Sequence, residues 1–205
     1  MSTSKNTPEH ILNTAEQLFA ENGYAGTSLR SIVKKAGVNL SAVSYHFGSK
    51  EDLYIAIVKR VAEPVDRKNK SILADYKKES NPISVEKILE AYLRAGFEAV
   101  FSNGDRSLQC AKFMGRCLTE PDFIRKKISE QFDPIEQDSL DELQKALPDK
   151  SRNDLNWKMD IVLAALLQIL IQSPKNKGLT QGDIAEEIAS TIQKMVDFFS
   201  PGMRT

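Results

Sequence analysis

The chain has 205 residues, of which 41% are hydrophobic and 27% charged, a balance that is ordinary for a folded globular protein and argues against wholesale disorder. Its formal net charge is zero, but residues 1–70 carry ten Lys and Arg against seven Asp and Glu. This mild excess permits a polyanionic partner for the N-terminal part without requiring one. No stretch reaches the roughly 18–20 apolar residues that a membrane span needs, so a transmembrane protein is excluded.

The two cysteines and the first residues indicate a reducing compartment. Cys110 and Cys117 are seven residues apart, which on a helix is about 10 Å, too far for a disulfide. Residues 1–10 contain no apolar run of the kind found in signal peptides. We therefore expect reduced thiols in a cytoplasmic protein.

Helical periodicity dominates the chain and the alternation typical of strands is absent, which predicts an all-α fold. Short turns join the first four expected helices, so these helices should pack as immediate neighbours. The first helix begins at Thr7-Pro8 and ends at Asn22-Gly23, and the second is capped by Thr27 and ends at Gly37. The third is capped by Asn39 and ends near Phe47. The fourth begins near Lys50 and should kink or break at Pro64.

Five further helices are expected in the rest of the chain. Proline should interrupt the third of these five at Pro134, and Ser200-Pro201-Gly202 should end the last one. Their expected ranges are about 83–101, 106–118, 121–147, 154–172 and 181–199.

The second and third helices, with the turn "AGVN" at 36–39 between them, have the form of a helix-turn-helix, because Gly37 can adopt a positive φ. Val38 and Val43 are expected to face the core. The outward side of the third helix then carries hydroxyls and methyls and almost no charge, which suits the major groove of DNA. These outward residues are Leu40, Ser41, Ala42, Ser44 and Tyr45.

Groups suited to phosphate flank this helix at the ends of its neighbours. Thr27 and Ser28 begin the second helix, and Ser49 and Lys50 begin the fourth, where free N–H groups and the helix dipole favour an anion. A reading helix can therefore have little charge, because its neighbours bind the backbone. The candidate DNA-binding residues are Thr27, Ser28, Arg30, Asn39, Leu40, Ser41, Ala42, Ser44, Tyr45, His46 and Lys50.

The stretch "LFAENGYAGTSLRSIVKKAGVNLSAVSYHFGSKEDLY" closely resembles the N-terminal domain of the TetR family of bacterial transcriptional repressors. The resemblance is strong over residues 10–58 and weakens beyond residue 60. The family usually carries Tyr at the position of Ser44, so a DNA contact is expected to shift to Tyr45. The segments "ALPDKSRNDLNWKMDIVLAALL" and "MVDFFSPGMR" resemble a subgroup that includes regulators of fatty-acid metabolism.

The resemblance implies a homodimer that binds operator DNA through two helix-turn-helix elements and releases it when a small inducer binds. It implies a DNA-binding domain at residues 1–48, with the helix-turn-helix at about 27–47, and a ligand-binding and dimerisation domain at residues 49–205. The two reading helices would enter successive major grooves, roughly 34–36 Å apart. No cofactor or metal is expected.

The expected helix at 154–172 is apolar nearly all round, so it must be buried on more than one side. One side can face its own core and the other a second subunit, and a wholly internal helix remains the alternative. Together with the last helix it would form a four-helix dimer interface. The candidate interface residues are Leu163, Leu166, Leu167, Leu170, Ile188, Ile192 and Met195.

Aromatic and soft apolar side chains lie on the three helices between 83 and 147, where they can line a ligand pocket or simply form core. Gly96, Gly115 and the break at Pro134 are expected to leave space there. Because few charges face inward, we expect an apolar or amphipathic ligand. The candidate ligand-binding residues are Leu93, Phe97, Phe101, Phe113, Met114, Cys117, Phe123 and Phe132.

Two other classes of function fit the sequence less well. An enzyme is disfavoured because the only histidines are His10 and His46, and no metal-binding spacing, nucleophile motif or phosphate-binding glycine loop is present. A helical protein-interaction adaptor explains the helices but not the hydroxyls, Tyr45, His46 and Lys50 around one short helix. DNA binding should weaken steeply with salt, whereas apolar helix docking should not.

Overall fold

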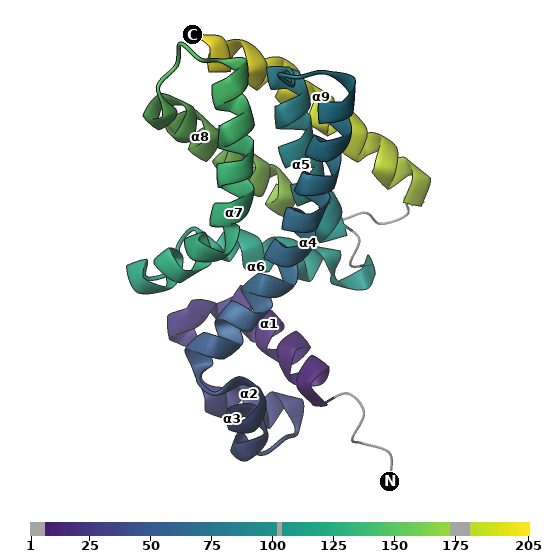
Figure 1. Ribbon diagram of the computed structural model, residues 1–205. Helices are drawn as coiled ribbons and strands as arrows, with labels where there is room; N and C mark the ends of the chain where they lie inside the picture. Colours follow the sequence, from purple (N-terminus) through teal and green to yellow (C-terminus); the bar gives the residue numbers. More distant parts are fainter. Residues whose placement is uncertain (1–6, 102–103, 173–180) are drawn as a thin grey trace. The chain divides into compact units, whose positions relative to one another are not determined.

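In a computed structural model that describes residues 7–101, 104–172 and 181–205, helices account for nearly all of the described chain and no strand occurs there, which confirms the all-α prediction (Figure 1). The elements are α1 (Thr7–Gly26), α2 (Leu29–Ala36), α3 (Leu40–Phe47), α4 (Lys50–Glu79), α5 (Val85–Phe101), the 3₁₀ turn η1 (Gly104–Arg106), α6 (Ser107–Cys117), α7 (Asp122–Ala146), α8 (Arg152–Gln172) and α9 (Gln181–Arg204).

The helices group into two compact units. The first consists of the described residues of 1–62 and 103–131, and the second of those of 63–102 and 132–205. In the first unit α1 packs against α2, α3 and α6, and in the second α5 packs against α8 and α9. Part of the C-terminal chain, α6, therefore groups with the N-terminal helices, while the expected domain boundary between residues 48 and 49 stays a prediction.

An aromatic cluster forms the core of the first unit. The ring of Tyr54 on α4 lies edge-on to Phe19 of α1, with 4.9 Å between centroids, and 5.1 Å from Phe113 of α6. All three side chains are fully buried. The apolar spacing of α1, α4 and α6 is thus satisfied by one shared core, which fixes the helices that support α2 and α3.

In the second unit α5 and α8 approach closely at Gly96. A Cβ atom on this residue would lie 2.7 Å from Cδ2 of Leu166, closer than side chains tolerate. The expectation that Gly96 leaves room for a ligand is therefore wrong, because Leu166 fills the space.

Two expected breaks are also wrong. α7 continues through Pro134, and α9 continues through Pro201 to Arg204. Buried side chains follow both prolines, Ile135 in α7 and Met203 in α9, and their packing offsets the lost backbone hydrogen bond. At Pro64, where the sequence predicts a kink or a break, α4 does not break. Among the described residues, no helix combines the length and apolar character needed to cross a membrane.

Candidate DNA-binding surface and ligand-binding residues

The helix-turn-helix is built by local capping interactions. Ser28 caps α2: its Oγ accepts a hydrogen bond from the Ser31 amide, and the Ser31 hydroxyl oxygen accepts one from the Ser28 amide. Gly37 ends α2 in the left-handed conformation, with φ 64° and ψ 29°, and Asn39 caps α3 through the Ala42 amide at 2.8 Å. The caps at Gly37 and Asn39 confirm the prediction, whereas the cap of α2 is one residue later than the expected Thr27.

α3 turns one apolar side inward and its polar side outward. Val43 is fully buried, whereas Ser41, Ser44 and His46 are exposed and the Tyr45 side chain is 86% exposed. Leu40 and Asn39 are also exposed, and Ala42 is half-buried. The outward residues expected from the sequence therefore share one accessible surface.

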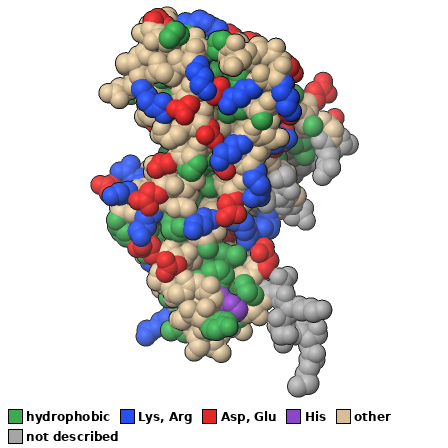
Figure 2. All heavy atoms as spheres, in the orientation of Figure 1, with side chains coloured by type: hydrophobic (Ala, Val, Ile, Leu, Met, Phe, Trp, Pro, Cys, Tyr) green, Lys and Arg blue, Asp and Glu red, His purple; other side chains and the backbone are tan. Residues whose placement is uncertain are grey.

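This surface carries little charge. Where α2 and α3 lie, at the bottom of the view in Figures 1 and 2, Figure 2 shows mainly polar, backbone and hydrophobic atoms and few Lys, Arg, Asp or Glu side chains. The exposed cations of α2 are Arg30, Lys34 and Lys35. Lys34 and Lys35 are not among the candidates predicted from the sequence, although a basic pair beside the expected reading helix is a pattern that indicates DNA binding.

Two candidate DNA-binding residues, buried Thr27 and half-buried Lys50, are hydrogen-bonded within the protein. Thr27 is buried, and its hydroxyl donates a hydrogen bond to the carbonyl oxygen of Leu18 at 3.1 Å. The Lys50 ammonium group donates to the carbonyl oxygens of Tyr24 and Thr27, at 2.9 Å each, and burial lowers its pKa. Both side chains therefore hold the segment that runs from the kink of α1 at Gly23 to the start of α2. Any contact that they make with DNA stays a prediction.

The start of α4 forms a capping box between Ser49 and Asp52. The Ser49 hydroxyl donates to Asp52 Oδ2 at 2.6 Å and its oxygen accepts from the Asp52 amide at 3.1 Å. Hydrogen bonds from Ser49 lower the pKa of the Asp52 carboxyl group. A carboxylate thus already occupies the end of α4 that was expected to attract phosphate.

The eight candidate ligand-binding residues fall into both units. Phe113, Met114, Cys117 and Phe123 belong to the first, and Leu93, Phe97, Phe101 and Phe132 belong to the second. Five are buried, Phe101 and Phe132 are half-buried, and Phe123 is exposed. In the second unit the rings of Phe97 and Phe101 stack with centroids 6.2 Å apart. Burial raises the pKa of Cys117 to about 12, so its thiol stays protonated at neutral pH.

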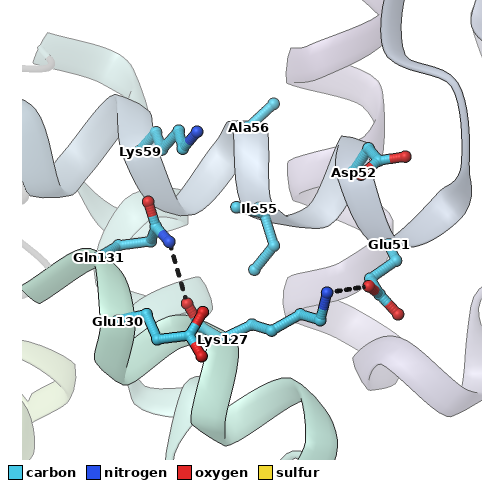
Figure 3. A pocket seen from close by; sticks show the side chains of 8 residues that line it. All are labelled: Glu51, Asp52, Ile55, Ala56, Lys59, Lys127, Glu130 and Gln131. Carbon is cyan, nitrogen blue, oxygen red and sulfur yellow. Dashed lines mark hydrogen bonds and ion pairs between the residues drawn. The ribbon is translucent and has the colours of Figure 1, made fainter.

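A pocket of about 230 Å³ in the first unit has a different character (Figure 3). Its wall is mostly charged: Lys127 pairs with Glu51 at 2.5 Å across its mouth, and Gln131 donates to the carbonyl oxygen of Lys127. None of the eight candidate ligand-binding residues lines it. Within the part of the chain that the structure describes, no group of His, Cys, Asp and Glu is arranged to hold a metal ion.

Most candidate interface residues are buried within a single chain. Leu166, Leu167 and Leu170 of α8 and Ile192 and Met195 of α9 are buried, and Leu163 and Ile188 are half-buried. The outer sides of these helices instead carry large exposed apolar residues: Trp157, Ile161 and Ile171 on α8, and Phe198 on α9. Most of the residues predicted from the sequence for a dimer interface therefore lie on the buried sides of α8 and α9, and their part in a dimer stays a prediction.

Two family models match the chain. The model described as "Bacterial regulatory proteins, tetR family" matches residues 11–57, and the model described as "Tetracyclin repressor-like, C-terminal domain" matches residues 90–202. The second match alone spans more than half of the chain.

Curated relatives resemble a short part of the chain. The transcriptional repressor AcnR of Corynebacterium glutamicum is 38% identical over 64 residues, which are 29% of this chain and 34% of AcnR. The transcriptional regulator AcrR of Shigella flexneri is 43% identical over 54 residues, 26% of this chain and 25% of AcrR. The chain thus matches about a third or less of the length of these relatives.

Solved structures share the fold over nearly the whole chain. The TetR family regulator PfmR of Thermus thermophilus has a TM-score of 0.63 at 16% identity, covering 93% of this chain and 97% of PfmR. The fatty acid degradation regulator FadR of Bacillus halodurans has a TM-score of 0.61 at 15% identity, covering 99% of this chain and 96% of FadR. The chain belongs to the TetR family of transcriptional regulators, whose members bind DNA, form dimers and carry a helical ligand-binding domain.

Proposed function

We propose that a dimer of this protein represses transcription by binding a palindromic operator through α3. The observation that carries the proposal is the accessible, nearly uncharged side of α3, where Ser41, Ser44 and Tyr45 stand together. Hydroxyl groups meet base edges or phosphates, and exposed Arg30, Lys34 and Lys35 on the neighbouring helix supply positive charge. The two α3 helices of the dimer would lie roughly 34–36 Å apart, one turn of DNA.

Salt dependence tests DNA binding directly. A duplex selected by the protein from a random pool is labelled, and its affinity is measured by fluorescence anisotropy between about 50 and 200 mM salt. If four or more phosphates are contacted, affinity should fall on the order of a hundredfold, through counterion release. A scrambled duplex of equal length is the control. Failure to select any sequence, or binding insensitive to salt, would favour the adaptor alternative.

We further propose that a small apolar or amphipathic inducer releases the operator. The buried rings and soft side chains of the candidate ligand-binding residues support the apolar part. Asn69 of α4 supports the amphipathic form: it is fully buried in the second unit and donates to Ser139 Oγ at 3.3 Å, while its Oδ1 has no hydrogen-bond partner among the described residues. A hydroxyl or amine on a ligand would satisfy such an acceptor.

Native mass spectrometry of protein purified from its own host would identify a retained inducer. We expect an added mass that organic extraction removes and that lowers operator affinity when it is added back. Complete release requires about a 10⁴-fold preference for the DNA-free state. A retained molecule that is wholly polar, such as a sugar, would contradict the proposed class of inducer.

A further inference from the structure

Glu120 lies between α6 and α7, far along the chain from the helix-turn-helix, yet it binds the turn that leads into it. Its carboxylate accepts a hydrogen bond from the Tyr24 amide with both oxygens, each at 3.0 Å. Its Oε1 also accepts from the Tyr54 hydroxyl at 3.3 Å. The Glu120 residue is only 6% exposed, and it belongs to the same compact unit as Tyr24.

Tyr24 is held on its other side by Lys50. The Lys50 ammonium group donates to the Tyr24 carbonyl oxygen at 2.9 Å and lies 3.9 Å from the centroid of the Tyr24 ring. The attraction of the Glu120 carboxylate counters the effect of burial on the pKa of Lys50. Both backbone polar groups of Tyr24 are therefore bound by charged side chains, and such hydrogen bonds are roughly twice as strong as neutral ones.

Gly23 makes this approach possible. Its φ of +71° turns the chain out of the α1 path, a conformation that residues with a Cβ rarely adopt. A Cβ atom here would lie 3.1 Å from Nε of Arg116 and 3.4 Å from Oε1 of Glu120. The turn thus combines a glycine conformation with a tight fit against the side chains of Arg116 and Glu120.

The turn determines where α2 begins. Thr27 follows Tyr24 by three residues, donates to the Leu18 carbonyl oxygen and accepts from Lys50, and Ser28 is then the N-cap of α2. α2 packs directly against α3. A shift at Tyr24 would therefore move the start of α2 and, through it, the exposed side of α3.

We propose that Glu120 is a positioning residue for DNA binding: its carboxylate fixes the Tyr24–Ser28 turn and thereby the placement of α2 and α3. This inference rests on the proposed operator binding. Glu120 lies outside residues 11–57, which match the DNA-binding family model. A buried carboxylate is costly unless it is hydrogen-bonded, and an apolar side chain would pack here at lower cost. The Glu120 carboxylate, by contrast, offers two acceptor oxygens to the Tyr24 amide.

The test compares Glu120→Gln and Glu120→Asp with the wild-type protein on the selected duplex. The glutamine has one acceptor oxygen and no charge, and the aspartate keeps the charge but is one methylene too short. Each variant should bind the duplex about tenfold or more weakly, because Ser28 and its neighbours are displaced. The slope of log affinity against log salt concentration should also become shallower, by the amount that the loss of about one phosphate contact causes. Hydrogen exchange of the free protein should show faster exchange of the amides of residues 24–31 than in wild type.

Glu16→Gln is the matched control. Glu16 is equally buried in the same unit and pairs with Arg106 at 2.5 Å and Arg60 at 3.3 Å, but contacts no residue of the turn in the described interactions. The folded Glu16→Gln protein should keep wild-type affinity within about twofold and an unchanged salt slope.

The inference is overturned by wild-type affinity and salt slope in both Glu120 variants, or by equal losses in the Glu16 control once the folded fraction is taken into account. If one Glu120 variant fails to fold, the comparison is made with the other. Unchanged amide hydrogen exchange at residues 24–31 in a folded Glu120 variant also overturns the inference. Failure of the wild-type protein to bind any duplex overturns the proposed operator binding instead, so the two failures are distinct.

Discussion

At the scale of single residues, Tyr45 is the most exposed aromatic side chain of the candidate DNA-binding surface. It lies near the end of α3, edge-on to His46 with 5.0 Å between ring centroids. A hydroxyl group at this place can donate a hydrogen bond to a phosphate of the DNA backbone. Such a contact does not distinguish one base sequence from another.

We therefore predict that Tyr45→Phe weakens binding to every DNA sequence by a similar factor, about fivefold, the worth of roughly one hydrogen bond. Gel shifts with the selected duplex and with single-base variants of it would measure this effect. Tyr76→Phe is the control, because the Tyr76 hydroxyl donates to Glu90 in the second unit. A loss confined to particular base pairs would instead assign Tyr45 to base reading, and an unchanged affinity would remove it from the interface.

Glu136 of α7 gives a prediction about pH. Burial raises the pKa of its carboxyl group, and the carboxylates of Asp160 and Asp133 raise it further. A raised pKa in the folded state means that ionisation costs stability: the cost is absent below the unfolded pKa, about 4.3, and complete above the folded pKa. Glu136→Gln should therefore stabilise the protein at pH 7, by less than about 1 kcal/mol because water screens a half-buried group.

Urea unfolding between pH 7 and about 4.5 would test this prediction, because the difference in the free energy of unfolding between Glu136→Gln and wild type should shrink as the pH falls. Asp141→Asn on the same helix is the control and should not stabilise, because Asp141 pairs with Arg152 at 2.7 Å. If Glu136→Gln raises the free energy of unfolding by the same amount at every pH, the charge of Glu136 is not the cause of the stabilisation.

At the scale of helices, the positions of the elements could be predicted closely because capping and periodicity are local. Asn39, Gly37 and the Ser49–Asp52 box each fix a helix end through contacts within four residues. The errors at Pro134 and Pro201 have a common physical reason. The local penalty of a proline is visible in the sequence, whereas the packing that offsets it comes from other helices.

The contact of α5 with α8 at Gly96 gives a stability prediction. Gly96→Ala should destabilise the protein by about 1–3 kcal/mol, because the overlap with Leu166 outweighs the better helix propensity of alanine. Gly202→Ala on α9 is a matched control: a Cβ there meets no atom within 4 Å, so it should be neutral or slightly stabilising. Urea unfolding would measure both changes, and equal effects of the two substitutions would contradict the close approach.

At the scale of the whole molecule, we propose that the outer sides of α8 and α9 form the dimer interface. Trp157, Ile161 and Phe198 are 61%, 41% and 77% exposed in a single chain, and large apolar residues in such numbers mark interaction sites. We predict that Ile161→Glu weakens the dimer by about 2 kcal/mol or more, roughly thirtyfold, and lowers operator affinity with it.

Sedimentation equilibrium would measure the dimer, and circular dichroism would confirm folding. Leu167→Glu is the contrasting variant: Leu167 is 6% exposed, so a charge there should unfold the second unit in place of splitting a folded dimer. An Ile161→Glu protein that remains a tight, operator-binding dimer would exclude this side of α8 from the interface.

The sequence by itself determined the helices, the helix-turn-helix and the outward side of α3, because these depend on periodicity, caps and a glycine turn within a few residues. Only the tertiary structure decided which side of α8 is core, that Leu166 fills the space at Gly96, and that Glu120 and Lys50 hold Tyr24. These features join residues up to 96 positions apart. No local pattern encodes such a pairing, because the burial and the contact partners of a side chain depend on which distant helix packs against it.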